Sequence, residues 1–324
     1  MTEPEVSVIV PARNAVETLP RLFDALDRST FEGEHEVILV DDGSTDGTPE
    51  LARERGAAVV SLQGQGGPAQ ARNAGLEAAR GPLIAFTDAD CEPCAQWLSE
   101  VVAALRAGAG LVRGPVKPDP RATVGPYDRT LWIDESSPLF ETANLAVTRA
   151  VADRVGGFIP FAPGPGAAPG LRPRVDEGHF GEDVVFGWSA RRAGARVVYA
   201  ERALVHHAVF PRGPRGFIAE RRRLRFFPAL VREIPELRGA LPGRYFLATR
   251  SAQVDLAVAG VALALARRRV WPLAAVVPYA TARLQWRSAW RRSVARRNLA
   301  YVAADGVGLV ALVRGSLAAR RLLL

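Results

Sequence analysis

The sequence of 324 residues is poor in cysteine, methionine and lysine, with two, one and one of each. Two cysteines are too few for the disulfide framework that stabilises many small secreted domains. The first residues also lack a positively charged segment followed by an apolar run, so they do not resemble a secretory signal peptide. We therefore expect the N-terminal part of the chain to work in the cytoplasm. A chain of this length can form one large domain with an appendage, or two ordinary domains.

Acidic residues are scarce in the last third of the chain. Residues 1–210 contain 20 arginines and lysines against 29 aspartates and glutamates, whereas residues 211–324 contain 22 against 5. We therefore predict two domains with these boundaries. In the second domain the arginines lie among leucine, alanine, valine and tryptophan rather than on a polar arm. This composition favours an anionic membrane surface as the partner and argues against nucleic acid.

Long apolar runs without charge are also absent from residues 211–324. Residues 245–266 are numerous enough to span a bilayer, but Arg250 and Asp255 interrupt them, and residues 270–282 and 299–313 are too few. We predict helices that lie on the cytoplasmic face of the membrane, flanked by arginines, and the segments leave room for one shallow hairpin in the bilayer. The alternative is an ordinary helical subdomain that packs on the rest of the protein or on a second subunit.

Short apolar runs alternate with helix-like stretches in the first 110 residues. The runs predict strands, and the stretches between them, with apolar residues three and four positions apart, predict helices. This alternation predicts an α/β fold with a mainly parallel sheet that helices cover on both faces. The predicted strands span residues 6–12, 36–42, 57–62 and 83–90, and the predicted helices span 16–28, 47–56, 68–80 and 93–107. Ligands bind such sheets beyond the carboxyl ends of the strands.

Aspartates follow two of the predicted strands. Asp41 and Asp42 begin a turn after the second strand. Acidic and small residues are common at such positions even without a ligand, because they form turns and cap helices. Asp88 and Asp90 follow the fourth strand. Two carboxylates one residue apart can share a hard divalent cation, Mg²⁺ or Mn²⁺, with phosphate oxygens and water. The recurrence of aspartates at two strand ends favours a ligand site over turn chemistry.

Two further groups of polar residues lie downstream. Glu182 and Asp183 precede a helix-like stretch, where acidic residues also stabilise the helix N-terminus without any catalytic role. His206 and His207 follow a strand-like run at residues 195–200. A histidine after a strand is more often structural than a ligand. An Asp-x-Asp sequence upstream, however, makes one of these two a candidate contact for a metal ion or a diphosphate.

These elements, taken in order, resemble the family 2 glycosyltransferases of the GT-A fold. The resemblance spans residues 6 to about 210 and rests on five segments: VSVIVPARNAVETLPRLFDAL, EVILVDDGSTDGT, ARNAGLEAARGPLIAFTDAD, ETANLAVTRAVADRVGGF and GEDVVFGWSARRAGARVVYAERALVHH. It implies an enzyme that moves one sugar from a nucleoside-diphosphate sugar, with a UDP-sugar favoured, to an acceptor hydroxyl and inverts the anomeric centre. A lipid-linked acceptor in cell-envelope glycan or glycolipid synthesis would suit the predicted membrane contact.

The resemblance also implies roles for residues on the donor side. Asp42 would contact the nucleoside, and Pro11 and Arg13 would lie beside its base. Asp88 would contact the ribose and help to hold the metal ion. Asp90 would be the main protein ligand of Mg²⁺ or Mn²⁺.

The remaining implied roles concern the acceptor side and a further metal ligand. Asp183 would be the catalytic base, with Glu182 beside it. Gly157 and Phe158 would belong to a glycine-rich helix end next to the donor sugar and the acceptor. The second histidine of the pair, His207, fits the position of a further contact to the metal or the diphosphate.

Two segments depart from the family pattern. Residues 158–182 are unusually rich in proline and glycine, which predicts a loop over the acceptor site. Residues 285–290, QWRSAW, resemble the Gln-x-x-Arg-Trp sequence of processive polysaccharide synthases only in part, since Ser288 and Ala289 stand at the Arg and Trp positions. We therefore expect transfer of a single sugar.

Three alternatives are open at this point. Residues 64–69, GQGGPA, match a dinucleotide-binding pattern and would suit an NAD-dependent oxidoreductase, although Pro68 removes an N–H group from the helix start that would hold the pyrophosphate. Cys91 and Cys94 could form a zinc or redox site, but no second cysteine pair accompanies them, and they otherwise open a helix. A non-catalytic nucleotide-sugar-binding protein would retain the same aspartates.

Overall fold

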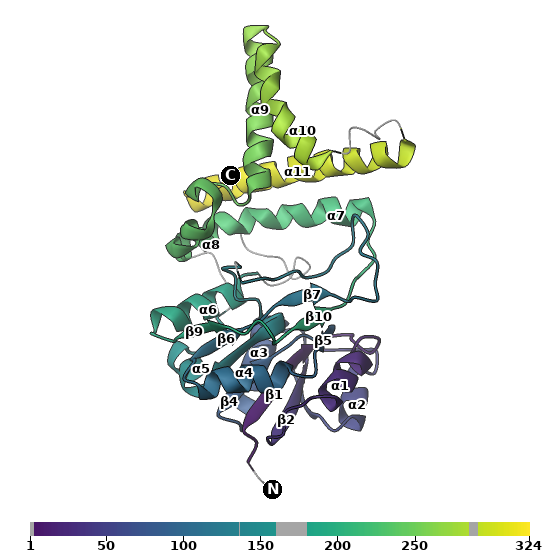
Figure 1. The fold of residues 1–324 in the computed structure, drawn as a ribbon, viewed down its shortest axis with the longest axis vertical. Helices are drawn as coiled ribbons and strands as arrows, with labels where there is room; N and C mark the ends of the chain where they lie inside the picture. The colour runs from purple at the N-terminus through teal and green to yellow at the C-terminus, as the bar shows by residue number, and fades with distance from the viewer. Residues whose placement is uncertain (1–2, 136, 160–179, 285–290) are drawn as a thin grey trace. The chain divides into compact units, whose positions relative to one another are not determined.

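The computed structural model describes residues 3–135, 137–159, 180–284 and 291–324. These residues form two compact units (Figure 1). The described residues of the first unit lie within 1–124, 130–161 and 178–210, and those of the second lie within 125–129 and 211–324. The QWRSAW sequence at 285–290, and most of the predicted acceptor loop, at 160–179, lie outside the described residues.

The first unit is built on a seven-stranded sheet in the order β3-β2-β1-β4-β8-β6-β9 (Figure 1). Neighbouring strands are parallel except at β8, which is antiparallel to β4 and β6. The prediction of a mainly parallel α/β sheet is therefore confirmed. The strands are β1 (Val6–Ala12), β2 (His35–Asp41), β3 (Ala58–Ser61), β4 (Leu83–Phe86), β6 (Leu111–Arg113), β8 (Leu145–Thr148) and β9 (Val197–Tyr199).

Helices cover both faces of this sheet. Along β1, Val8 and Val10 belong to the same buried cluster as the apolar residues of α1 and α4, while Ile9 faces α3. Gly75 lets α3 lie this close, because a Cβ at that position would be 2.4 Å from Ile9 Cγ2. The helices of the unit are α1 (Leu19–Asp27), α2 (Thr48–Glu54), α3 (Gly67–Ala78), α4 (Trp97–Arg106), α5 (Arg149–Val155) and α6 (Glu182–Arg192), with a short 3₁₀ helix η1 (Thr142–Asn144).

The chain differs from the prediction after the fourth strand. β4 ends at Phe86 instead of continuing to residue 90, so the Asp-x-Asp sequence lies in a turn. Residue 93 was predicted to begin a helix, but it ends the short strand β5 (Cys91–Pro93), and α4 begins later. The reason is a long-range pairing: β5 is antiparallel to β10 (Val205–His207), which also pairs with β7 (Val116–Pro118) in a separate three-stranded sheet.

The second unit is helical. Its longest helix, α11 (Arg292–Ala319), packs along the consecutive segments α7 (Pro214–Glu220), η4 (Arg221–Phe226) and α8 (Phe227–Glu233) (Figure 1). Helix α9 (Thr249–Arg267) contacts α10 (Val277–Arg283) and α11. Short 3₁₀ helices complete the unit: η5 (Pro235–Ala240), η6 (Pro242–Arg244) and η7 (Trp271–Val276).

One helix of this unit has the dimensions of a membrane span. Among the described residues, α11 alone is long and apolar enough to cross a bilayer, although buried helices of water-soluble proteins meet the same criteria. Its most apolar part is 39% buried within the protein. The prediction that residues 299–313 are too short to span a bilayer was wrong about length, because the helix continues beyond this segment at both ends.

Candidate active site at the carboxyl ends of the parallel strands

The loops after β1 and β2 are fastened to one another. Asn14 adopts a left-handed backbone conformation (φ 49°), its N–H donates to Ser44 Oγ at 2.9 Å, and its Oδ1 accepts from Thr45 N at 2.9 Å. The two residues predicted to flank the nucleobase lie here: Pro11 is half-buried at the end of β1, and Arg13 is exposed. A fixed loop with an exposed guanidinium suits the binding of a planar base and its phosphates.

Asp42, directly after β2, holds the start of α3. Its carboxylate accepts hydrogen bonds from Gly66 N at 2.6 Å and from Gly67 N at 3.0 Å, and the residue is nearly buried. These amides belong to the GQGGPA segment, where a dinucleotide pyrophosphate would need them free. Because a carboxylate offers about four lone-pair sites, Asp42 retains capacity for a further donor such as a nucleobase N–H.

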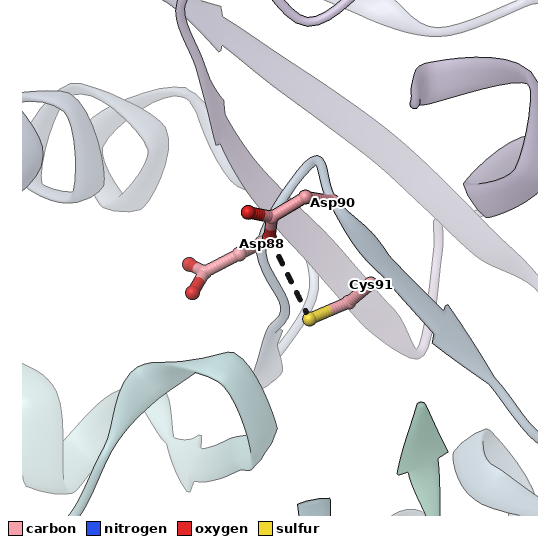
Figure 2. A group of neighbouring side chains, drawn as sticks. All are labelled: Asp88, Asp90 and Cys91. Atoms are coloured by element: carbon pink, nitrogen blue, oxygen red, sulfur yellow. Dashed lines mark hydrogen bonds between the residues drawn. The ribbon is translucent and has the colours of Figure 1, made fainter. Parts of the chain in front are cut away.

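The turn after β4 brings Asp88 and Asp90 together. Both are half-buried, and their carboxylates lie on one side of the turn (Figure 2). With Cys91 they form the one group, within the part of the chain that the structure describes, whose ligand atoms are close enough to hold a metal ion, within 4.8 Å of one another. Cys91 is buried, and its Sγ lies 4.0 Å from Asp90 Oδ1 (Figure 2).

The thiol of this group differs from the two carboxylates as a ligand. Burial, together with the charges of Asp88 and Asp90, raises the pKa of the Cys91 thiol well above its usual value. Sulfur binds metals as thiolate, whereas Mg²⁺ and Mn²⁺ prefer carboxylate oxygen. The donor set therefore suits a hard divalent cation on the two aspartates. Cys94 lies outside the group and both cysteines are free, which argues against the zinc or redox alternative.

Strand β10 places a histidine beside this turn. His207 is nearly buried, and its Nε2 lies 3.5 Å from Asp90 Oδ2. Its Nδ1 lies 2.6 Å from the carbonyl oxygen of Ala208, so Nδ1 must carry a hydrogen. In the neutral ring Nε2 then points a lone pair at a carboxylate, and either a second proton or a cation between them stabilises this arrangement. His206 instead has its Nδ1 3.3 Å from Pro118 O.

The distance between His207 Nε2 and Asp90 Oδ2 is compatible with two ligands of one metal ion. Adjacent ligands at about 2.1 Å from an octahedral ion lie about 3 Å apart. The observed 3.5 Å between His207 and Asp90 is close to this value. The two carboxylates therefore suit a divalent cation by their chemistry, whereas His207 approaches Asp90 but does not belong to the group formed by Asp88, Asp90 and Cys91.

Arg72 of α3 links this turn to the start of α6, and the sequence motifs alone gave it no role. Its guanidinium donates to Asp88 Oδ1 at 3.3 Å and to Glu182 Oε1 at 3.2 Å, and only 7% of its side chain is exposed. A buried cation shared by two carboxylates fixes both and offsets their repulsion. One feature of the sequence could have indicated this role. Arg72 lies between Ala69 and Leu76 at helical spacing, so a charged residue stands on the apolar face of the predicted helix.

The two acidic residues at the start of α6 have different environments. Glu182 is nearly buried and bonded to Arg72, whereas Asp183 is half-buried. Burial, and then the charge of Glu182, raise the pKa of Asp183 to about 8, while the charge of Arg72 opposes this shift. A general base works best when its pKa lies near the working pH, so this environment suits proton abstraction by Asp183.

Helix α3 also fixes the glycine-rich segment around Gly157. Asn73 Nδ2 donates to Phe158 O at 2.8 Å, and Asn73 Oδ1 accepts from Phe158 N at 2.7 Å. Gly157 (φ 73°) permits this contact, because a Cβ there would be 2.6 Å from Asn73 Oδ1. The Phe158 ring is buried against Phe86 and Phe186, so it anchors the glycine-rich segment to the core beneath the site.

The Asn73 clamp leads to a stability prediction. Asn73→Ala removes both hydrogen bonds to Phe158 and should lower the free energy of unfolding by about 1–3 kcal/mol, because the backbone groups left behind are shielded from water. Urea unfolding followed by circular dichroism measures the change. Gln70→Ala, at an exposed position of the same helix, is the control and should cost less than about 0.5 kcal/mol. Equal stability of the two variants would contradict the clamp.

Solved structures share this architecture. The mannosyltransferase PcManGT from Pyrobaculum calidifontis, solved in complex with GDP-Man and Mn²⁺, aligns over 96% of this chain and 88% of its own, with a TM-score of 0.60 and 22% identity. TarS of S. aureus aligns over 96% of this chain and 55% of its own, with a TM-score of 0.50 and 19% identity. At these identities the likeness concerns the fold alone. That fold, with aspartates at the strand ends, is the fold of the GT-A glycosyltransferases.

Sequence relatives then give the family. Residues 7–162 match the model of Glycosyl transferase family 2. Over 211 residues the chain is 33% identical to glycosyltransferase AglE of Haloferax volcanii. This alignment covers 60% of this chain and 69% of AglE. The uncharacterized glycosyltransferase EpsJ of Bacillus subtilis is 42% identical over 91 residues, 27% of this chain and 26% of its own length. The chain belongs to glycosyl transferase family 2 and is a glycosyltransferase, which replaces the oxidoreductase alternative.

Proposed function

We propose that the protein transfers a single sugar from a nucleoside-diphosphate sugar to an acceptor hydroxyl, with inversion of the anomeric carbon. The Arg72 bridge is the observation that carries this proposal. One buried guanidinium contacts Asp88, the candidate ligand of metal and ribose, and Glu182, the neighbour of the candidate base. The residues suited to hold the donor and those suited to activate the acceptor thus meet at one edge of the sheet.

A divalent metal ion, Mg²⁺ or Mn²⁺, is part of this proposal. Asp90 would be its main protein ligand, with Asp88 and His207 as further contacts. The close approach of His207 Nε2 to Asp90 Oδ2 supports this set. When bound, such an ion neutralises the negative charge that grows on the departing nucleoside diphosphate.

The nucleoside would bind beside the loops after β1 and β2. Asp42 would accept a hydrogen bond from it, and Pro11 and Arg13 would flank the base. The support is that Asp42 lies at the end of β2 with acceptor capacity left, and that Arg13 is exposed in the adjoining loop. We favour a UDP-sugar as donor and regard a GDP-sugar as the first alternative.

Asp183 would act as the base. It would take the proton from the acceptor hydroxyl while that oxygen bonds to the anomeric carbon and the bond from this carbon to the diphosphate oxygen breaks. A single displacement of this kind inverts the anomeric centre without a covalent intermediate. Glu182 would position Arg72 and α6 rather than touch the substrate, since its carboxylate is bonded to Arg72 in a nearly buried place.

The acceptor and the cellular location complete the proposal. We infer a lipid-linked acceptor, used at the cytoplasmic face of the membrane in cell-envelope glycan or glycolipid synthesis. Two features of the helical unit support this inference: the excess of arginine over acidic residues and the dimensions of α11. A third is the set of exposed apolar side chains on α9, Leu256, Val258, Val261, Leu263 and Leu265.

The raised pKa of Asp183 predicts a pH profile. Only the ionised carboxylate accepts a proton, so kcat/KM for the acceptor should be full above this pKa and fall as the pH is lowered through it. The acidic limb should therefore lie above the ordinary aspartate value of about 4, and the nearby metal charge should keep it below the metal-free value of about 8. Initial rates at saturating donor and metal give the profile. A kcat/KM that stays constant as the pH is lowered to about 4, the ordinary aspartate pKa, would contradict this prediction.

Nucleotide release tests the proposed function directly. The full chain, purified in an uncharged detergent, is incubated with a panel of UDP-, GDP- and dTDP-sugars, with Mn²⁺ or Mg²⁺ and with EDTA. We expect slow release from one donor that depends on the metal. Metal-dependent binding of a donor without any release, with or without acceptor extracts, would favour the non-catalytic alternative. No binding of any donor would overturn the proposal.

A further inference from the structure

The helical unit contains a cavity that the transfer reaction does not use. It has a volume of about 240 Å³ and lies between η4, the first turns of α9 and the middle of α11. Most of its wall is apolar and is formed by Leu224, Val254, Leu309 and Leu312 among others. The polar groups of the wall are few, and two of them are arginines.

These two arginines are not used by ion pairs among the described residues. Arg221 stacks its guanidinium over the Phe217 ring at 4.9 Å, and its Nε is buried without a hydrogen-bond partner. Arg250 is exposed at the mouth of the cavity, in the first turn of α9. Burial and the like charge of Arg250 lower the pKa of Arg221, so an anion between the two would relieve a repulsion.

The charges of Glu220 and Asp305 oppose this lowering of the Arg221 pKa, but the hydrogen bonds of Asp305 go to other groups. Asp305 already accepts from Tyr279 Oη at 3.0 Å and from Arg283 Nε at 3.2 Å. Asp255 has its Oδ2 buried without a hydrogen-bond partner, and burial raises the pKa of this carboxyl.

The start of α9 adds a second attraction for anions. This helix has 19 residues, and its first turn, with Arg250 and Ser251, lies in the wall of the cavity. The N-terminus of a helix carries partial positive charge and unpaired N–H groups, which favour phosphate. Guanidinium groups add bidentate hydrogen bonds to phosphate oxygens.

We propose that this cavity binds the phosphate head of a lipid phosphate, with Arg221 and Arg250 on the phosphate and the start of the hydrocarbon chain along the apolar wall. The combination of two cations with leucine and valine side chains distinguishes such an amphiphile from a free phosphate, which needs no apolar wall. It also disfavours a nucleic acid, whose repeating phosphates need an open basic groove. The proposal concerns binding alone and does not depend on the transfer reaction.

Binding of simple amphiphiles tests the site. The full chain in an uncharged detergent is titrated by calorimetry with dodecyl phosphate, with inorganic phosphate and with dodecanol. We expect dodecyl phosphate to bind at least about tenfold more tightly than the other two, because only it satisfies both the arginines and the apolar wall. Binding of inorganic phosphate as tight as that of dodecyl phosphate would overturn the lipid assignment in favour of a free-phosphate site.

Charge-removing variants locate the binding. Arg250→Gln, at an exposed position that tolerates substitution, should weaken dodecyl phosphate at least about tenfold, the usual range for a lost charge-assisted hydrogen bond. Arg221→Gln should do the same, with circular dichroism as a check of folding. The control is Arg267→Gln, which removes the same charge from the far end of α9 and should change affinity by less than about twofold. An equal loss in the control would show diffuse electrostatic attraction and overturn the site.

Discussion

Replacing Asp183 by asparagine should lower turnover by about 10²- to 10⁴-fold, the usual contribution of a positioned general base. Asparagine keeps the shape of the side chain but cannot accept the proton of the acceptor hydroxyl. Donor binding should be nearly unchanged, because the proposed donor contacts lie on the turn after β4 and on the loops after β1 and β2. Rates and donor affinities of the two proteins, measured at the same pH and metal concentration, separate the two effects.

Stability measurements guard against a trivial loss of activity in this variant. The folded-state pKa of Asp183 is raised above its unfolded value, so the ionised carboxylate destabilises the fold as the pH rises through that range. Asp183→Asn should therefore unfold at the same or a higher temperature than the parent at neutral pH. Asp153→Asn, at an exposed position of α5, is the matched control and should keep full activity. Full turnover by Asp183→Asn would remove Asp183 from the mechanism.

Replacing Asp90 by alanine should abolish the dependence of donor binding on metal. Loss of groups that only support a metal ligand commonly costs about 10- to 100-fold in metal affinity, so loss of a main ligand should cost at least this much. Titration of donor in the presence of Mn²⁺, Mg²⁺ and EDTA measures the effect. In the parent protein, donor should bind much more weakly in EDTA than with Mn²⁺ or Mg²⁺. In the variant, the three titrations should give the same affinity.

Cys91→Ser is the sharpest control for this experiment, because Cys91 belongs to the same group of side chains as Asp88 and Asp90. Its buried thiol has a raised pKa and is a poor partner for a hard cation, so the variant should bind metal and donor as the parent does. A loss as large as that of Asp90→Ala would instead indicate a thiolate ligand and a softer metal ion. Unchanged titrations with Asp90→Ala would contradict the proposed site.

The local parts of the fold were predictable from sequence. Strand β1 agrees with its predicted range at both ends, because seven consecutive apolar or small residues leave few alternatives in a parallel sheet. The positions of Asp42, Asp88 and Asp90 after strand ends followed from the same pattern. By contrast, β5 contains only three residues and exists through its pairing with β10, more than 100 residues later. Pairing at such a separation leaves no periodic signal in either segment.

The least predictable part of the site was the role of Arg72. Its partner Glu182 lies 110 residues away in sequence. An arginine within a predicted helix is far more often a solvated surface residue than a buried bridge, so its chemistry emerges only when α3 and α6 are placed together. The same holds for Asn73, whose partner Phe158 is 85 residues distant. The motifs identified the candidate carboxylates, whereas the residues that contact them became evident only from the tertiary structure.

Helix α3 contacts both the proposed donor side of the site, at Asp42 and Asp88, and the proposed acceptor side, at the start of α6. Its first turn is tied to Asp42 through Gly67, and its next turn carries Arg72 and Asn73, which hold the metal turn, the start of α6 and the Phe158 backbone. A helix of 12 residues is about 18 Å long and bends little over that length. The proposed nucleoside contact and the proposed base are therefore positioned by one and the same helix.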